Sequence, residues 1–174
     1  MMLTEPAMEF GLQIRAYRQE FLDCGDSMDG TSGLKDAEDP GKWIENCRLM
    51  KDSGSVPEGL VPATQYIYVR EDDGKIVGML QIRHCFNAYL EKYGGHIGYS
   101  VAPSERCKGY ASRMLRTALP KCRELGLDRV LVTCNDTNAG SRKTILANGG
   151  VYESTVYEPD ERVHLERYWI DSSR

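Results

Sequence analysis

Long apolar runs are missing from this sequence of 174 residues, and so is an excess of basic side chains. No window approaches the roughly 20 consecutive apolar residues that a membrane-spanning helix needs. The 22 basic and 26 acidic side chains give a formal net charge of −4, whereas a nucleic-acid-binding domain normally carries a basic excess. The sequence therefore predicts that neither a membrane nor a nucleic acid is a main partner of this protein.

Metal-binding and disulfide patterns are also missing. The six cysteines form no C-x-x-C pair, and no histidine lies near one of them at metal-ligand spacing. We therefore expect reduced thiols that serve mostly as small buried apolar groups, and no metal site.

A targeting pattern is absent at the N-terminus, which lacks a basic start followed by an apolar run. A cytoplasmic location is the resulting expectation. The length suits one core, and neither an internal repeat nor a linker divides the chain. We therefore expect a single domain over residues 1–174.

Hydrophobic periodicity predicts helices and strands that alternate only in the middle of the chain. This order is typical of a mixed-sheet α/β or α+β fold. Asp39-Pro40 indicates a helix start, and Asp73-Gly74 indicates a hairpin turn. The expected helices cover residues 9–22, 40–51, 109–125 and 138–148, and the expected strands lie in 64–71, 75–84, 96–101, 129–135 and, as a pair around a Pro-Asp turn, 151–170.

The junction after the strand "HIGYSV" draws attention to chemistry. A proline turn follows the strand, and then "RCKGYA" (residues 106–111) opens the clearest amphipathic helix of the chain. Free backbone N–H groups at a helix start attract anions. Neither the Walker pattern nor G-x-G-x-x-G occurs, so the anion is not expected to belong to a nucleotide held by either of those loops.

The composition of this loop suits a pyrophosphate. Gly109 allows close approach to the backbone, Ala111 allows tight packing of the first turn, and Ser112 adds a hydroxyl donor. Basic side chains precede the helix, whose N-terminus carries a partial positive charge. The residues predicted to bind the pyrophosphate are Arg106, Cys107, Lys108, Gly109, Tyr110, Ala111 and Ser112.

Two motifs in this part of the chain resemble the general-control N-acetyltransferase (GNAT) superfamily. The first is "RCKGYA", which fits the family's Arg/Gln-x-x-Gly-x-Gly/Ala loop after a strand. The second is "VTCNDTNAGSRKTILANGG", which fits the family's strand-ending Asn, its Asn-x-x-Ala/Ser helix start and its closing glycine through Asn135, Asn138, Ser141 and Gly149. The resemblance is specific over residues 96–152.

The resemblance implies a fold with a central, mostly antiparallel, twisted sheet and about four flanking helices. It implies acetyl transfer from acetyl-CoA to a primary amine of a small molecule or a protein, by direct attack in a ternary complex. No metal is involved in this chemistry, and a homodimer is an assembly that such a domain can form. Asn135, Asn138 and Ser141 would join Val101 in binding the acyl-CoA.

The resemblance also implies roles in catalysis. The Val101 N–H, on a bulged strand, would stabilise the oxyanion that forms on the thioester. The family's acid, a tyrosine, falls on Ile145 here, so Ser141, water, another tyrosine or unassisted departure of the thiolate must replace it. His96 stands where many relatives have a glutamate, and it could act as the base.

Structural roles are an alternative for each of these residues. The basic pair of the loop could be a solvated turn, the two asparagines could be helix or turn caps, and His96 could be a packed strand residue. The alternative to an enzyme is a non-catalytic acyl-CoA-binding module, which the isoleucine at position 145 keeps open.

Overall fold

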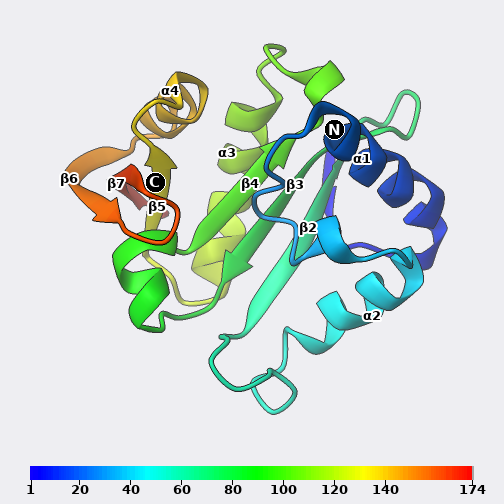
Figure 1. Cartoon of the computed structure of the whole chain (residues 1–174), viewed down its shortest axis with the longest axis horizontal. Helices are drawn as coiled ribbons and strands as arrows, with labels where there is room; N and C mark the ends of the chain where they lie inside the picture. The colour runs from blue at the N-terminus through cyan, green and yellow to red at the C-terminus, as the bar shows by residue number, and fades with distance from the viewer. Residues whose placement is uncertain (174) are drawn as a thin grey trace.

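The structure is a computed structural model, and it describes residues 1–173. One seven-stranded sheet forms the centre, with α-helices on both faces (Figure 1). The strands are β1 (Met2–Thr4), β2 (Ala63–Val69), β3 (Ile76–Arg83), β4 (Ile97–Val101), β5 (Arg129–Asn135), β6 (Val151–Glu158) and β7 (Val163–Asp171). The helices are α1 (Gly11–Cys24), α2 (Pro40–Leu49), α3 (Tyr110–Glu124) and α4 (Ala139–Ala147), with short turns η1 (Met8–Phe10), η2 (Leu34–Asp36), η3 (Leu90–Gly94) and η4 (Pro103–Glu105).

The strand order is β1-β2-β3-β4-β5-β7-β6. Every neighbouring pair is antiparallel except β4 and β5, which are parallel. The predicted mixed α/β architecture with a mostly antiparallel sheet is confirmed. Strand β1 was not predicted, because three residues are too short to show a periodic pattern.

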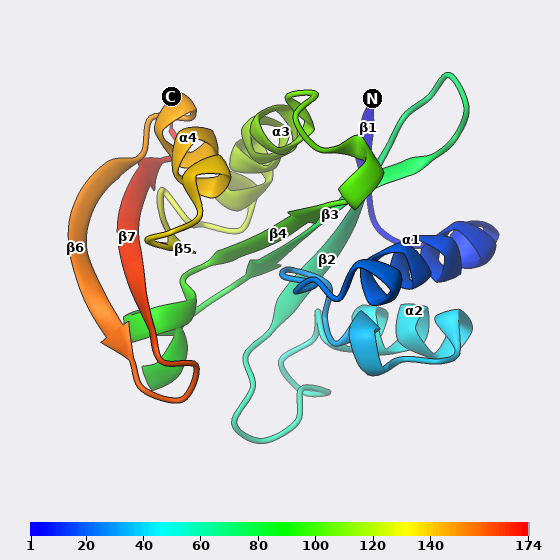
Figure 2. The ribbon, with the colours of Figure 1, turned by 45° about the horizontal axis from the view of Figure 1, so that its top comes forward.

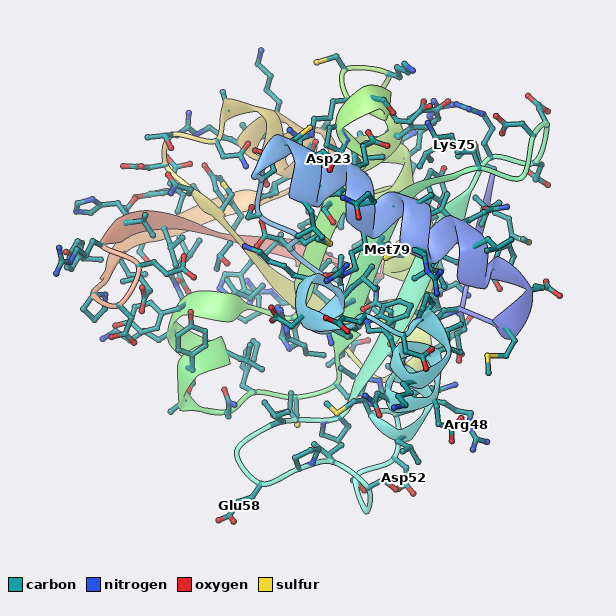
Figure 3. The ribbon with its side chains drawn as sticks, turned by 45° about the vertical axis from the view of Figure 1, so that its right-hand side comes forward. Asp23, Arg48, Asp52, Glu58, Lys75 and Met79 are labelled. Atoms are coloured by element: carbon teal, nitrogen blue, oxygen red, sulfur yellow. The ribbon has the colours of Figure 1, made fainter. Side chains whose placement is uncertain are left out.

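Two apolar clusters hold the helices on the sheet. Figure 2 shows α3 and α4 on one side of the sheet and α1 and α2 on the other. Leu115 of α3 and Ile145 of α4 belong to the first cluster, and Phe21 of α1 and Trp43 of α2 belong to the second. Met79 of β3 lies beneath α1 (Figure 3). Because both faces are covered, β2 and most of β3 are buried.

Local signals place the element ends where the sequence predicts them. The Asp39 side chain accepts hydrogen bonds from the N–H groups of Gly41 and Lys42, so it caps α2. Gly74, in the β2–β3 hairpin, and Gly126, after α3, both have left-handed backbones, a conformation that glycine adopts without steric cost. Within residues 1–173, no helix is both long and apolar enough to cross a bilayer.

Candidate active site

Strands β4 and β5 separate soon after they meet. Among the described residues, their register has a single paired position, Ile97 with Val132. Strand β5 instead pairs along its whole length with β7, from Arg129 to Asn135. The sheet therefore opens between β4 and β5 beyond Ile97, and this opening lies beside the loop that leads into α3.

Backbone groups of β4 point into this opening. The Arg83 N–H donates to the His96 carbonyl at 2.8 Å, and the Ala102 N–H donates to the Val77 carbonyl at 2.9 Å. Hydrogen-bonded and non-hydrogen-bonded pairs alternate in an antiparallel ladder. The backbone groups of the odd-numbered residues of β4, Tyr99 and Val101 among them, therefore point away from β3 and toward the opening.

The bulge expected in β4 is wrong. The register of β3 and β4 is continuous from Gly78 opposite Val101 to Ile82 opposite Ile97. The Val101 N–H reaches the opening because β5 diverges, and no extra residue in β4 is needed. The direction of this N–H group therefore has a different cause from the bulge that the resemblance implies, and its role as the oxyanion donor stays a prediction.

The start of α3 has no side-chain cap. Gly109 is the N-cap residue, with φ +76°, and the first turn bond runs from the Arg113 N–H to the Gly109 carbonyl at 3.2 Å. The N–H groups of Tyr110, Ala111 and Ser112 therefore have no partner within the helix. A side chain at position 109 would meet no heavy atom within 4 Å, so the space in front of these N–H groups is open.

The basic side chains of the loop are bound within the protein. The guanidinium of Arg106 pairs with Asp26 at 2.7 Å and donates to the Val101 carbonyl at 3.3 Å. The ammonium of Lys108 contacts Glu105 at 2.9 Å. Backbone N–H groups, rather than these two charges, therefore form the freest donors of the loop. Cys107 between them is exposed and has a left-handed backbone at φ +60°.

Glu105 anchors the loop to the β2–β3 hairpin. Glu105 is 4 % exposed. Its carboxylate accepts hydrogen bonds from Arg70, Lys75 and Lys108, each at 2.9 Å. These hydrogen bonds, led by that from Lys75, lower the pKa of Glu105 to about 2. Figure 3 shows Lys75 at the hairpin end of the sheet. Sequence analysis missed this cluster because its members are far apart along the chain.

The remaining loop side chains stabilise the helix pair. The Tyr110 hydroxyl accepts from Arg70 at 3.1 Å, so its ring turns toward the Glu105 cluster. The carbonyl and the hydroxyl of Ser112 both accept from the Asn148 amide of α4 at 3.2 Å. The side chain of Tyr110 is therefore turned away from the helix start, whereas the Ser112 hydroxyl only accepts here and keeps its own proton to donate to an anion. Ala111 is small and partly buried, as expected of a tightly packed first turn.

The two asparagines after β5 are turn and helix caps. Asn135 Oδ1 accepts from the Thr137 N–H at 2.9 Å, and Asn138 Oδ1 accepts from the Ser141 N–H at 2.9 Å. The structural alternative for both side-chain oxygens is confirmed. Their amide nitrogens donate no hydrogen bond within residues 1–173, so these N–H groups can serve a ligand in the opening.

A tyrosine from β4 reaches the helix that begins after β5. The Tyr99 hydroxyl lies 2.8 Å from Ser141 Oγ. Burial raises the pKa of Tyr99 to about 12, so its hydroxyl keeps its proton near neutral pH. Ile145, by contrast, is fully buried in the apolar cluster. Motif spacing along α4 places the family's acid at position 145. Such spacing cannot locate a side chain that reaches α4 from another strand.

The surroundings of His96 favour the packed strand residue over the catalytic base. Its Nδ1 accepts from the Leu131 N–H at 2.9 Å, and its ring lies 3.9 Å from that of Phe86, between centroids. Burial, and then the charge of Arg83, lower its pKa to about 4. The nitrogen that could accept a proton is already occupied, so His96 is a packed residue that joins β4 to β5.

Substitution His96→Gln should reduce stability and leave kcat within a few-fold. Loss of a buried hydrogen bond costs about 1–3 kcal/mol in the free energy of unfolding. Because the folded pKa is about 4 and the ordinary value is 6.5, the unfolded chain takes up the proton first as pH falls. Wild-type stability therefore declines from pH 6.5 toward 4, and the deficit of the variant narrows over this range.

Urea unfolding at pH 7 and pH 5 measures this effect. The matched control is His164→Gln, which changes an exposed histidine of β7 and should have little effect on stability. A wild-type-like unfolding curve for His96→Gln, together with a large loss of kcat, would restore His96 as the base.

No group of three or more His, Cys, Asp or Glu side chains that could hold a metal ion occurs in residues 1–173. The site described above consists of backbone N–H groups, amides and hydroxyls, which suit an anionic ligand with a carbonyl group.

Comparison with known proteins agrees with this geometry. A search of curated proteins finds no match, but the sequence model described as "Acetyltransferase (GNAT) family" matches residues 35–149. Among solved structures, RimJ from Mycobacterium smegmatis in complex with CoA-disulfide has 21 % identity and a TM-score of 0.71, over 98 % of this chain and 81 % of that one.

Two further solved structures share the fold. The ribosomal-protein-S5-alanine acetyltransferase from Vibrio fischeri has 17 % identity and a TM-score of 0.68, over 98 % of this chain and 92 % of that one. The microcin C7 self-immunity acetyltransferase MccE, in complex with acetyl-CoA and AMP, has 16 % identity and a TM-score of 0.70, over 97 % and 91 %. Motifs, fold and family match agree, and the chain belongs to the GNAT acetyltransferase family.

Proposed function

We propose that this protein transfers an acetyl group from acetyl-CoA to a primary amine by direct attack within a ternary complex. The observation that carries the proposal is the opening between β4 and β5 beside an uncapped helix start. The opening between the strands suits an extended acyl-thioester arm, and the helix start suits a pyrophosphate. The complexes of RimJ with CoA-disulfide and of MccE with acetyl-CoA and AMP support this choice of donor.

The helix start holds the anionic end of the donor. The N–H groups of Tyr110, Ala111 and Ser112 point to the open space before Gly109, and the helix dipole favours negative charge there. The anchoring of the loop through Glu105 fixes these donors before the ligand arrives. The amides of Asn135 and Asn138 are placed at the end of β5 to contact the arm that follows.

The amine nitrogen attacks the thioester carbon, and the carbon–sulfur bond breaks. The Val101 N–H donates to the carbonyl oxygen as negative charge develops on it. The amine proton passes to water, because His96 is packed in the core and its Nδ1 is occupied. The thiolate receives a proton from the hydroxyl pair of Tyr99 and Ser141, which replaces the missing tyrosine of α4 and regains its proton from water.

Acetyl-CoA should stabilise the folded protein, whereas ATP and NAD should not. At a concentration of one hundred times Kd, a ligand that binds only the folded state adds about 2.7 kcal/mol to the free energy of unfolding. A thermal melt with each compound at millimolar concentration measures this. Absence of a shift with acetyl-CoA would count against the whole assignment.

A non-catalytic acyl-CoA-binding module is the second candidate, because Ile145 occupies the position of the family's acid. Both candidates predict the thermal shift, but only the enzyme releases free thiol from acetyl-CoA when an amine is present. A thiol assay over a panel of small amines and peptide N-termini therefore separates them. Binding without thiol release from any acceptor would favour the module.

A further inference from the structure

Arg83 carries a charge that no carboxylate in residues 1–173 neutralises at ion-pair distance. It ends β3, and its guanidinium is largely removed from water, so burial lowers its pKa. Asp29 acts on it only from beyond that distance, and its carboxylate accepts from Ser27 at 2.9 Å. A desolvated cation without a counter-ion is costly for a protein to keep.

Only one edge of the guanidinium is used within the protein. Nη1 of Arg83 donates to the carbonyls of Gly94 and Gly95 at 3.0 and 3.2 Å. Nη2 and Nε donate no hydrogen bond within residues 1–173. Neither atom is among the buried polar atoms without a partner, which are Gln13 Oε1, Asn148 Oδ1 and Glu158 Oε1. The free edge of the fork therefore still meets solvent.

The free edge lies over β4. Arg83 Nη2 is 3.2 Å from the position that a Cβ on Gly98 would occupy, so the guanidinium lies directly against the backbone of this residue. Gly30 of the α1–α2 connection packs on the same residue, because a Cβ at Gly30 would lie 2.1 Å from the Gly98 carbonyl oxygen. Two glycines thus bring this connection, the guanidinium and β4 together.

This position is on the acceptor side of the proposed reaction. Side chains of β4 alternate, and Tyr99 packs against the α3–α4 cluster, whereas Ser100 contacts Tyr17 of α1 at 3.1 Å. Gly98 shares the face of Ser100. Val101 is three positions beyond Gly98, or about 10 Å along a strand. Helices α3 and α4 pack on the opposite face, so we place the amine on this one, beside the α1–α2 connection that packs on Gly98.

We infer that the acceptor amine carries an anionic group, a carboxylate or a phosphate, that pairs with the free edge of Arg83. The flat fork of arginine matches the two oxygens of such a group. The acceptor class is then a small amino acid or an aminoalkyl phosphate, with the anion and the amine within about 10 Å of each other. This inference deepens the proposed function and rests on it.

Matched pairs of amines test the inference. One arm compares ω-amino carboxylates of increasing length with their amides, and the other compares 2-aminoethyl phosphate with 2-aminoethanol. We expect kcat/KM to favour the anionic member of at least one pair by about 10–100-fold, mainly through KM, as for hydrogen bonds to a charged group. The arm with the larger preference identifies the anion as carboxylate or phosphate.

Three variants assign the preference to Arg83. Arg83→Gln should remove most of it, and Arg83→Lys should retain only part, because the ammonium keeps the charge but not the fork. Arg48→Gln removes one positive charge from α2, where the side chain is 73 % exposed, and should retain the full preference. A melting curve for each variant verifies folding, and Arg83→Lys decides the matter if Arg83→Gln fails to fold.

Binding separates this inference from the proposed function. The same amines are titrated into the protein with and without CoA, so that the affinity ratio within each pair is obtained without turnover. If no amine causes thiol release, but anionic amines bind about tenfold more tightly and Arg83→Gln removes this preference, acetyl transfer is rejected and the anion site is retained. Equal affinity of anionic and neutral partners, or a preference that survives in Arg83→Gln, would overturn the inference even if transfer occurs.

Discussion

Replacement of Tyr99 by phenylalanine should lower kcat by about 10²-fold, at the lower end of the range for general acids. The hydroxyl lies 2.8 Å from Ser141 Oγ, and burial keeps it protonated, with a pKa of about 12. The lower end is expected because a thiol with a pKa of about 8.5 leaves readily even with little assistance. The variant should bind acetyl-CoA as the wild type does.

A double-mutant cycle of Tyr99 and Ser141 tests whether the two hydroxyls act together. If Tyr99 and Ser141 act as one proton-donating unit, Ser141→Ala should cost about as much as Tyr99→Phe, and the double variant little more. Tyr157→Phe is the control, because this tyrosine of β6 is half exposed. Independent, additive losses would show that the two hydroxyls serve different steps.

The pH profile tests Tyr99 as a donor that stays protonated, and the melting temperature separates a chemical role of Tyr99 from a structural one. With a pKa of about 12, Tyr99 stays protonated through pH 10, so it should contribute no alkaline decline of kcat in that range. A wild-type kcat in Tyr99→Phe would reject the role as proton donor. So would a fall in melting temperature large enough to account for the loss of kcat through unfolding.

Substitution Gly109→Val should weaken acetyl-CoA binding by about 10–100-fold, the loss expected when hydrogen bonds to a charged group are broken. The side chain would enter the open space before the start of α3, where a Cβ at Gly109 meets no atom within 4 Å. A branched residue there would keep the pyrophosphate away from the backbone N–H groups. Isothermal titration with CoA measures the loss.

Strain must be separated from obstruction, because Gly109 has φ +76° and valine is disfavoured in that conformation. Gly126, at the other end of α3, has φ +77° and equally open surroundings. Gly126→Val therefore carries a similar backbone strain far from the site. We expect similar losses of stability in the two variants but a loss of affinity only in Gly109→Val, and equal affinities would place the pyrophosphate elsewhere.

Several features of this protein follow from local sequence patterns. The caps at Asp39 and Asn138, the hairpin turn at Gly74 and the amphipathic pattern of α3 each depend on a few neighbouring residues. Such signals act through backbone geometry and hydrogen bonds that span a single turn. The sequence therefore predicts the order of the elements, and its two motifs predict the family.

The roles of individual side chains depend on contacts that sequence spacing does not show. His96 meets Leu131 across 35 residues, and Tyr99 meets Ser141 across 42. A strand pattern places a histidine on a face, but it does not reveal which neighbouring strand donates to the ring. For this reason the sequence left the role of His96 open between base and packed residue, and it named Ser141 and another tyrosine as alternative acids without predicting that Tyr99 and Ser141 meet.

By itself the sequence determined the family, the element order and the backbone loop that suits a pyrophosphate, because short-range patterns encode turns, caps and periodicity. The tertiary structure decided that β4 and β5 diverge, that Glu105 neutralises the lysine of the loop, and that Arg83 has no carboxylate at ion-pair distance within residues 1–173. Each of these depends on burial and on charges brought together from distant segments. Desolvation then sets whether a polar group is held within the protein or left for a ligand.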